Sequence, residues 1–177
     1  YYRLFIHKYI TEYDKVIFSD VDIVILKDLY PVFSTDINEY YLGATKQTKV
    51  NILPEEDYKK YINKADSIKQ GNYFNAGFLL MNLDKIRKGD YDNEFIALSK
   101  VGFNNNDQDI LNLKFQDQVK YISIKYHYIP IDTYFDKLDK SKISKIHSPA
   151  EIDEYKKDPA IIHYLGTKPW NINSLEF

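Results

Sequence analysis

Two aspartates separated by one residue follow the first strongly apolar segment of the chain. Val16–Phe18 is β-branched and aromatic, which predicts a short buried strand, and Asp20 and Asp22 come directly after it. If the backbone stays extended through Val21, both carboxylates point to one face and Val21 to the other. Two carboxylates on one face repel each other unless a cation lies between them. The natural cation is Mg²⁺ or Mn²⁺, although an isolated pair of this kind is more often a solvated polar turn.

Other polar side chains lie beside apolar segments further along. His163 follows the predicted strand 160–162, and Asn75 precedes another such run. Ligands of open α/β sheets bind beyond the carboxyl ends of the strands, so Asp20, Asp22 and His163 become neighbours if their strands run parallel. Two carboxylates and an imidazole leave half of an octahedral shell for diphosphate oxygens, and the nitrogen ligand suits Mn²⁺ better than Mg²⁺. Taken alone, without the acidic pair, His163 is more typical of a hydrogen-bonded core histidine.

Three further groups each have a structural and a functional interpretation. In the functional interpretation, Gly166 permits close backbone approach to a ligand and Lys168 reaches a phosphate. In the structural interpretation, both residues belong to a surface turn. Asp107 and Gln108 begin a predicted helix, where Asp is an ordinary N-cap, or they lie beside a polyhydroxy ligand. Arg3 is a solvated helix residue, or it lies behind the acidic pair and balances its charge.

Composition limits the class of protein. The chain has 177 residues with a net charge of -2 and a hydrophobic fraction of 44%. That length suits one domain with a sizeable core, and the near-neutral charge gives no case for nucleic acid as a partner. The absence of Cys excludes disulfides, thiolate catalysis and cysteine-bound metals. No apolar run approaches the roughly 18 residues that span a bilayer, and no signal peptide is recognisable.

Strand-like and helix-like segments alternate along the chain, which favours a layered α/β domain. Helical spacing or start signals predict helices at 3–13, from 54 onward, at 82–88, at 93–101 and after residue 107. Short apolar runs predict strands at 16–18, 23–26, 40–44, 78–81, 119–124 and 160–162.

Four segments together resemble the glycosyltransferase family 8 enzymes, which have the GT-A fold. They are Tyr13–Asp22, Tyr73–Leu83, Asp107–Asn112 and His163–Trp170. They occur in the family's order and cover nearly the whole chain. The resemblance implies a Rossmann-like mixed sheet flanked by helices. It also implies that residues 1–177 form one partial catalytic domain, truncated at its N-terminus. A unit of about 30 or more residues that contacts the nucleotide base would precede Tyr1.

The resemblance implies a retaining hexosyltransferase. It would move glucose or galactose from UDP-glucose or UDP-galactose to a saccharide or glycolipid acceptor, such as a bacterial cell-surface glycan. Mn²⁺, with Mg²⁺ as the alternative, would be bound by Asp20, Asp22 and His163. A cytoplasmic location is implied, with contact at the membrane surface compatible with it. The oligomeric state is not indicated.

Further site residues are assigned by the same resemblance. Gln108 and Asp107 match catalytic positions beside the donor sugar, with Gln108 nearest the anomeric carbon. The residues that match substrate-binding positions are Arg3, Asp20, Val21, Asn75, Ala76, Gly77, Asp107, Gln108, Gly166 and Lys168. An amide is a weak nucleophile, which favours front-side attack by the acceptor over a double displacement. A covalent route through Asp107 or Asp109 is the alternative.

Two other functional classes are compatible with the residues alone. The acidic pair also suits a metal-dependent hydrolase or phosphotransferase. A chain without its nucleotide-binding start would also suit an inactive remnant that acts as a binding module.

Overall fold

The main sheet has four strands and mixed direction. The structure, a computed structural model, describes residues 1–130, 138–166 and 168–171. In spatial order the strands are β1 (Lys15–Ser19), β4 (Phe74–Asn82), β3 (Leu42–Lys46) and β5 (Val119–Tyr121). β1 and β3 run antiparallel to β4, whereas β5 runs parallel to β3. The mixed sheet implied by the sequence is therefore confirmed.

A second, two-stranded sheet lies beside the first. It pairs β2 (Ile23–Ile25) with β6 (Ile161–His163) in antiparallel direction, and Ile23 lies opposite His163. The expectation that parallel strands bring the aspartates to His163 was therefore wrong. Antiparallel pairing places the start of β2 against the end of β6, so the residue before β2 meets the last residue of β6.

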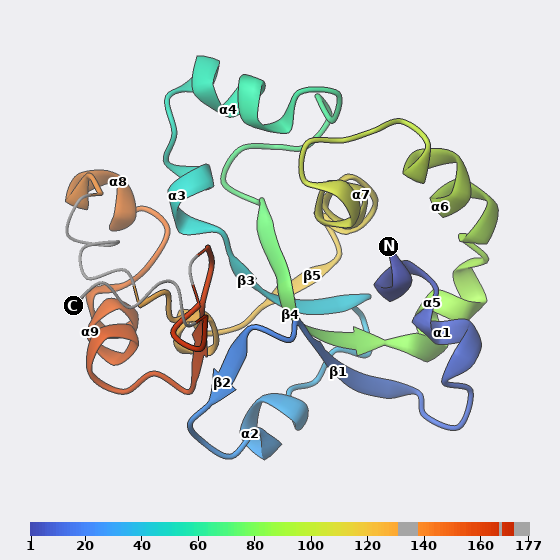
Figure 1. The fold of residues 1–177 in the computed structure, drawn as a ribbon, viewed down its shortest axis with the longest axis horizontal. Helices are drawn as coiled ribbons and strands as arrows, with labels where there is room; N and C mark the ends of the chain where they lie inside the picture. Colours follow the sequence, from blue (N-terminus) through green and yellow to red (C-terminus); the bar gives the residue numbers. More distant parts are fainter. Residues whose placement is uncertain (131–137, 167, 172–177) are drawn as a thin grey trace.

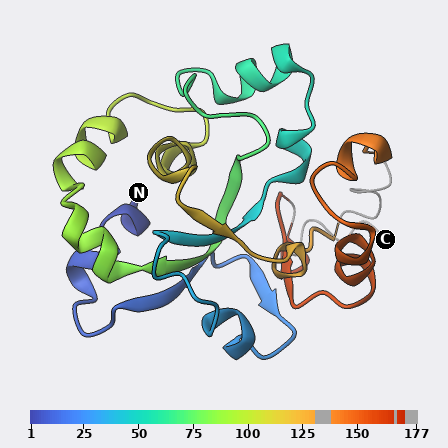
Figure 2. The same ribbon diagram turned by 180° about the vertical axis from the view of Figure 1, so that it is seen from behind.

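Helices surround the sheets, as expected. In Figure 1, α1, α5, α6 and α7 gather on one side of β4, and α8 and α9 lie on the other, an arrangement also seen from behind in Figure 2. In the described ranges, no helix is long and apolar enough to cross a membrane. The α-helices are α1 Ile6–Tyr9, α2 Tyr30–Phe33, α3 Thr48–Asn51, α4 Glu55–Ile62, α5 Leu83–Gly89, α6 Asp92–Ser99, α7 Asn106–Phe115, α8 Lys140–Ile143 and α9 Pro149–Lys157. The 3₁₀ helices are Tyr2–Leu4 and Ile124–His127.

β4 and α7 form the centre of the fold. Every residue of β4 except Asn82 is buried. The side chain of Asn112, in α7, accepts a hydrogen bond from the Phe74 N–H at 2.8 Å and donates one to the Phe74 carbonyl at 2.9 Å. It also donates to the Gln108 carbonyl at 2.9 Å. These bonds hold the first turns of α7 against the first residues of β4.

Three local predictions differ from the structure. The predicted buried strand at Val16–Phe18 is only half-buried, because β1 is an edge strand that pairs with β4 alone. The predicted helix 3–13 is two short turns interrupted at Phe5. The N-cap position of α7 is Asn105 rather than Asp107, which lies in the first turn.

We expect the fold to lose stability in mild acid through His147. Its Nε2 lies 2.8 Å from the Thr48 hydroxyl, and burial lowers its pKa from 6.5 to about 4. Between these values the unfolded chain binds a proton that the folded chain does not, so the free energy of unfolding falls as the pH drops. The loss between pH 7 and pH 4 is about 2 to 3 kcal/mol.

Denaturant unfolding at several pH values measures this loss. His147→Gln, which keeps a polar partner for Thr48, should flatten the slope below pH 6.5. An unchanged slope in that variant would show that His147 is not the responsible group.

Candidate active site

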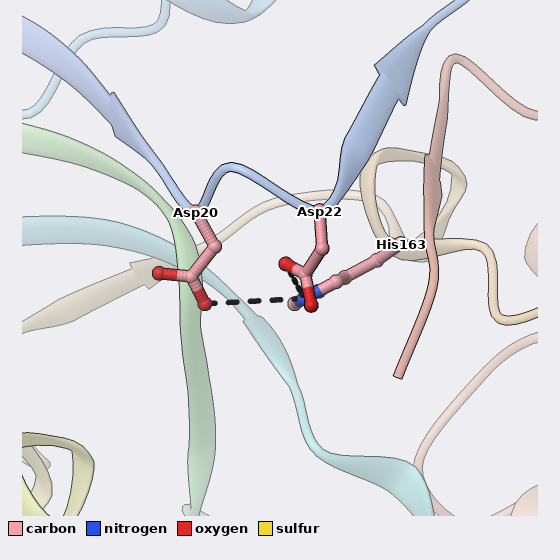
Figure 3. A group of neighbouring side chains, drawn as sticks. All are labelled: Asp20, Asp22 and His163. Atoms are coloured by element: carbon pink, nitrogen blue, oxygen red, sulfur yellow. Dashed lines mark ion pairs between the residues drawn. The ribbon is translucent and has the colours of Figure 1, made fainter. Parts of the chain in front are cut away.

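Asp20, Asp22 and His163 lie together as a potential metal-binding group. One ligand atom from each lies within 4.8 Å of the other two. The Nε2 atom of His163 is 3.1 Å from Oδ1 of Asp22 and 3.9 Å from Oδ2 of Asp20. Figure 3 shows both carboxylates on the same side of the backbone, facing the imidazole. The structure thus brings together the three residues that the sequence proposed as ligands.

The backbone between the aspartates bends rather than staying extended. Val21 is fully exposed at the bend. The Asp20 N–H donates to the Gly77 carbonyl at 2.7 Å, and the Asp22 carbonyl accepts from the Tyr164 N–H at 2.9 Å. Each aspartate is therefore fixed to a different sheet, and the two carboxylates still face one side.

The protonation states suit metal binding. Burial lowers the pKa of His163, against the opposing effect of Asp22 and Asp20. Burial acts to raise the pKa of Asp22, but the hydrogen bond from Lys168 and the nearby His163 outweigh it, so the net pKa is below its ordinary value. At neutral pH the imidazole is neutral and the Asp22 carboxylate ionised, which are the forms that coordinate a metal.

The imidazole of His163 also lacks hydrogen-bond partners. Its side chain is 2% exposed, Nδ1 has no hydrogen-bond partner within the described chain, and Nε2 approaches Asp22 at 3.1 Å without good hydrogen-bond geometry. A buried nitrogen facing two carboxylates would be satisfied by a cation between them. Two carboxylates and one imidazole form a donor set that fits Mn²⁺ and, less well, Mg²⁺.

Arg3 connects the acidic pair to the start of α7. Its Nη2 is 2.6 Å from Oδ1 of Asp20, and its Nε is 2.6 Å from Oδ2 of Asp107. The guanidinium also donates to the Ala76 carbonyl and lies 4.7 Å from the centre of the Phe18 ring. Of the two sequence interpretations of Arg3, the charge-balancing one is confirmed.

Gln108 is held at both ends of its amide. Its Oε1 accepts from the Ala76 N–H at 2.9 Å and from the Asn75 amide at 3.3 Å, and its Nε2 donates to the Tyr73 hydroxyl at 3.0 Å. Asn75 Oδ1 accepts from the Gly77 N–H at 2.7 Å. Asn75, Ala76, Gly77 and Gln108 therefore form one hydrogen-bonded group.

Asp109 supports the start of α7 from inside the core. It is fully buried, and it accepts from the Tyr73 hydroxyl at 2.6 Å and from the Asn105 N–H at 2.8 Å. Burial and the neighbouring carboxylate raise the pKa of Tyr73, so its hydroxyl remains a donor. Because its oxygens are occupied inside the core, Asp109 is poorly placed as a nucleophile. Asp107, with a side chain 15% exposed, is the more accessible carboxylate.

Gly77 and His127 both pack against the imidazole of His163. A Cβ at Gly77 would overlap Cε1 of His163 and lie 2.9 Å from its Nδ1. The His127 ring centre is 5.1 Å from that of His163, and burial lowers the pKa of His127 to about 3. Nothing in the local sequence pointed to His127, because it ends a 3₁₀ helix and its partner His163 lies far along the chain in β6.

The loop after β6 contributes Lys168. Its ammonium group is 2.5 Å from Oδ2 of Asp22 and also donates to the Tyr164 carbonyl. Gly166 has φ of +88°, and a Cβ there would meet no atom within 4 Å. Backbone conformation alone therefore accounts for glycine at this position.

Several proteins are similar to this chain over most of its length. The solved structure of the galactosyltransferase LgtC, in complex with donor and acceptor sugar analogues, covers 98% of this chain and 60% of its own, with 32% identity and a TM-score of 0.72. The glycosyltransferase GlyE of Streptococcus pneumoniae is 30% identical over 174 residues, 96% of this chain and 36% of its own length. A lipopolysaccharide 1,2-glucosyltransferase of Escherichia coli is 28% identical over 181 residues, 97% of this chain and 49% of its own.

The chain thus spans between 36% and 60% of the length of these proteins. The sequence profile of glycosyl transferase family 8 matches residues 1–174. The similar structures are GT-A glycosyltransferases, in agreement with the mixed sheet described above. The chain therefore belongs to glycosyl transferase family 8 and has the GT-A fold.

Proposed function

We propose that this chain contains the metal and sugar sites of a retaining hexosyltransferase. The enzyme moves glucose or galactose from a UDP-sugar to a saccharide or glycolipid acceptor. It works in the cytoplasm, at the membrane surface when the acceptor is a glycolipid. The observation that carries the proposal is the group of Asp20, Asp22 and His163, with ligand atoms within 4.8 Å of one another, linked through Arg3 to the start of α7.

The charged residues of the site assist the departure of UDP from the sugar. Asp20, Asp22 and His163 would hold Mn²⁺, with Mg²⁺ as the alternative. Such a cation, when bound, neutralises the negative charge that builds on the departing diphosphate. Lys168, which contacts Asp22, adds a positive charge in the same region. Gly166, in the same loop, takes the left-handed backbone conformation of the turn that precedes Lys168.

The hydrogen-bonded group at the start of α7 binds the donor sugar. Asn75, Asp107 and Gln108 bind and orient the hexose, and the acceptor hydroxyl attacks from the face that the diphosphate leaves. The bond from the anomeric carbon to the phosphate oxygen breaks as the new glycosidic bond forms. The hydroxyl proton passes to the departing phosphate oxygen. An amide held at both ends suits orientation better than nucleophilic attack.

The decisive test is a screen of UDP-sugars for release of UDP by the full-length protein, with and without Mn²⁺. We expect Mn²⁺-dependent release, accelerated by an acceptor, and a product that keeps the anomeric configuration. Full turnover without an acceptor would instead indicate a hydrolase or phosphotransferase. Absence of metal-dependent UDP binding in calorimetry would indicate a binding module.

Gln108→Ala should retain measurable transfer. Loss of the positioning amide is expected to lower kcat by about 10- to 100-fold with little change in KM for the donor, since orientation matters most in the transition state. Gln118→Ala, at an exposed position just before β5, is the matched control and should be unaffected. Complete loss of transfer with intact UDP-sugar binding would mean that Gln108 does more than orient the sugar.

A further inference from the structure

A cavity that does not include Asp20, Asp22 or His163 lies between α3 and α8. Its volume is about 530 Å³. The two helices lie side by side in Figures 1 and 2, and Lys142 Nζ reaches the Ile52 carbonyl between them at 3.4 Å. This volume is in the range of about 300 to 1,000 Å³ that small-molecule sites occupy. None of the residues assigned to the metal or the sugar lines it.

The charge of this cavity is positive and uncompensated. Lys46, Lys142 and Lys145 line it, and none of its lining residues in the described chain is a carboxylate. None of the three ammonium groups has a carboxylate within ion-pair distance among the residues whose structure is described. Glu151 acts to raise the pKa of Lys46, but its carboxylate is hydrogen-bonded to Ser148 at the start of α9.

Lys46 is the deepest of the three lysines. It is half-buried at the end of β3, its Nζ lies 4.7 Å from the centre of the Tyr121 ring, and burial lowers its pKa. A partly buried ammonium group without a carboxylate partner gains by meeting an anion. The Tyr121 hydroxyl also donates to the Asn72 carbonyl at 2.6 Å, which fixes the part of the cavity wall that Asn72 forms.

Neutral donors accompany the lysines. Asn72 lines the cavity, and its side-chain amide forms no hydrogen bond to any residue in the described ranges. Next to it Gly71 has φ of +95° and nothing within 4 Å of its Cβ position, so the wall is open there. Three ammonium groups and a free amide match the oxygens of a phosphate, which lysine binds as a point charge.

The cavity shares its wall with the strand that carries the sugar site. Lys46 pairs with Phe74, the residue before Asn75, and the Gln47 N–H donates to the Tyr73 carbonyl at 3.0 Å. A ligand in the cavity would therefore lie next to the first residues of β4. We infer that this cavity binds the phosphate group of a phosphorylated saccharide, which, if the proposed transfer reaction holds, is the acceptor.

Calorimetry on the full-length protein with glucose 6-phosphate tests the binding, with glucose as the neutral probe and glucuronic acid as the carboxylate probe. We expect saturable binding of glucose 6-phosphate that weakens with salt, weaker binding of glucuronic acid and none of glucose. The double variant Lys142→Gln/Lys145→Gln changes two exposed positions and leaves the core intact, and it should raise the Kd for glucose 6-phosphate at least tenfold. Asn72→Asp should abolish binding, and Lys100→Gln, an exposed lysine elsewhere, should change Kd less than twofold.

Two outcomes would overturn the inference. One is glucose 6-phosphate binding that is absent or unaffected by the cavity variants, and the other is binding that UDP with Mn²⁺ displaces, which would locate it at the metal group. Acceptor-stimulated release of UDP separates this result from the proposed function. A protein that transfers sugar from a UDP-sugar to an acceptor but does not bind glucose 6-phosphate refutes the cavity inference and leaves the proposed transferase function standing. A protein that binds the sugar phosphate and turns over donor, but never transfers to any phosphorylated saccharide, refutes the acceptor role.

Discussion

Replacing Asp22 with asparagine is expected to reduce sugar transfer by on the order of a thousandfold while the domain stays folded. The substitution removes one of two carboxylate charges facing His163, and the neutral amide is a poor metal ligand. It also removes the anionic partner of Lys168. The backbone anchor survives, because the Asp22 carbonyl accepts from Tyr164 whatever the side chain is.

Calorimetry of UDP binding with and without Mn²⁺, together with thermal unfolding, measures the effect of Asp22→Asn. The metal-dependent part of UDP binding should disappear, with only a small change in Tm. Asp66→Asn, at an exposed position outside the site, is the matched control and should bind UDP normally. If Asp22→Asn unfolds the protein, the acidic pair has a structural role instead.

Gly77→Ala is expected to disrupt the group of Asp20, Asp22 and His163, although Gly77 is not a proposed ligand. The added methyl group would overlap Cε1 of His163 and lie 2.9 Å from Oδ1 of Asn75. His163 has little room to move, because the His127 ring packs 5.1 Å from it and its own side chain is buried. We expect a loss of stability of about 1 to 3 kcal/mol from overpacking, and at least a tenfold loss of Mn²⁺ affinity as the imidazole is displaced.

A double-mutant cycle separates the clash from other effects of Gly77→Ala. In a His163→Ala background the overlap with the imidazole is removed and only the close contact with Asn75 Oδ1 remains, so Gly77→Ala should destabilise the protein less than it does in the wild type. Equal destabilisation in both backgrounds would show that the cost arises elsewhere. Retention of wild-type Mn²⁺ affinity in the single variant would refute the displacement of the imidazole.

The sequence predicted the layers of the fold better than the directions of its strands. Short apolar runs such as Phe78–Met81 predict buried strands because burial on both faces demands continuous apolar residues. Strand direction depends on the pairing partner, and β2 finds its partner in β6 far along the chain. The proximity of Asp20, Asp22 and His163 was therefore predicted correctly, but through a parallel arrangement that the structure does not have.

The supporting residues of the site were harder to predict. Tyr73 and His127 act through contacts with Asp109 and His163, which lie 36 residues further along in each pair, and no local pattern marks such pairs. Gly77 was assigned to the substrate by resemblance. Its packing against His163 is a physical reason for glycine that needs no substrate, and that reason becomes visible only when β4 and β6 are placed together.

The hydrogen bonds between Asn112 and Phe74 limit which parts of the proposed active site can move or change. Because both the N–H and the carbonyl of Phe74 are engaged by one side chain, α7 cannot slide along β4 without breaking both bonds. The strand and the helix behave as a single rigid support that fixes Asn75 and Gln108 relative to each other. In the proposed transfer reaction, the loops around this support can vary in length and composition to suit different acceptors, while Asn75 and Gln108 keep their relative geometry.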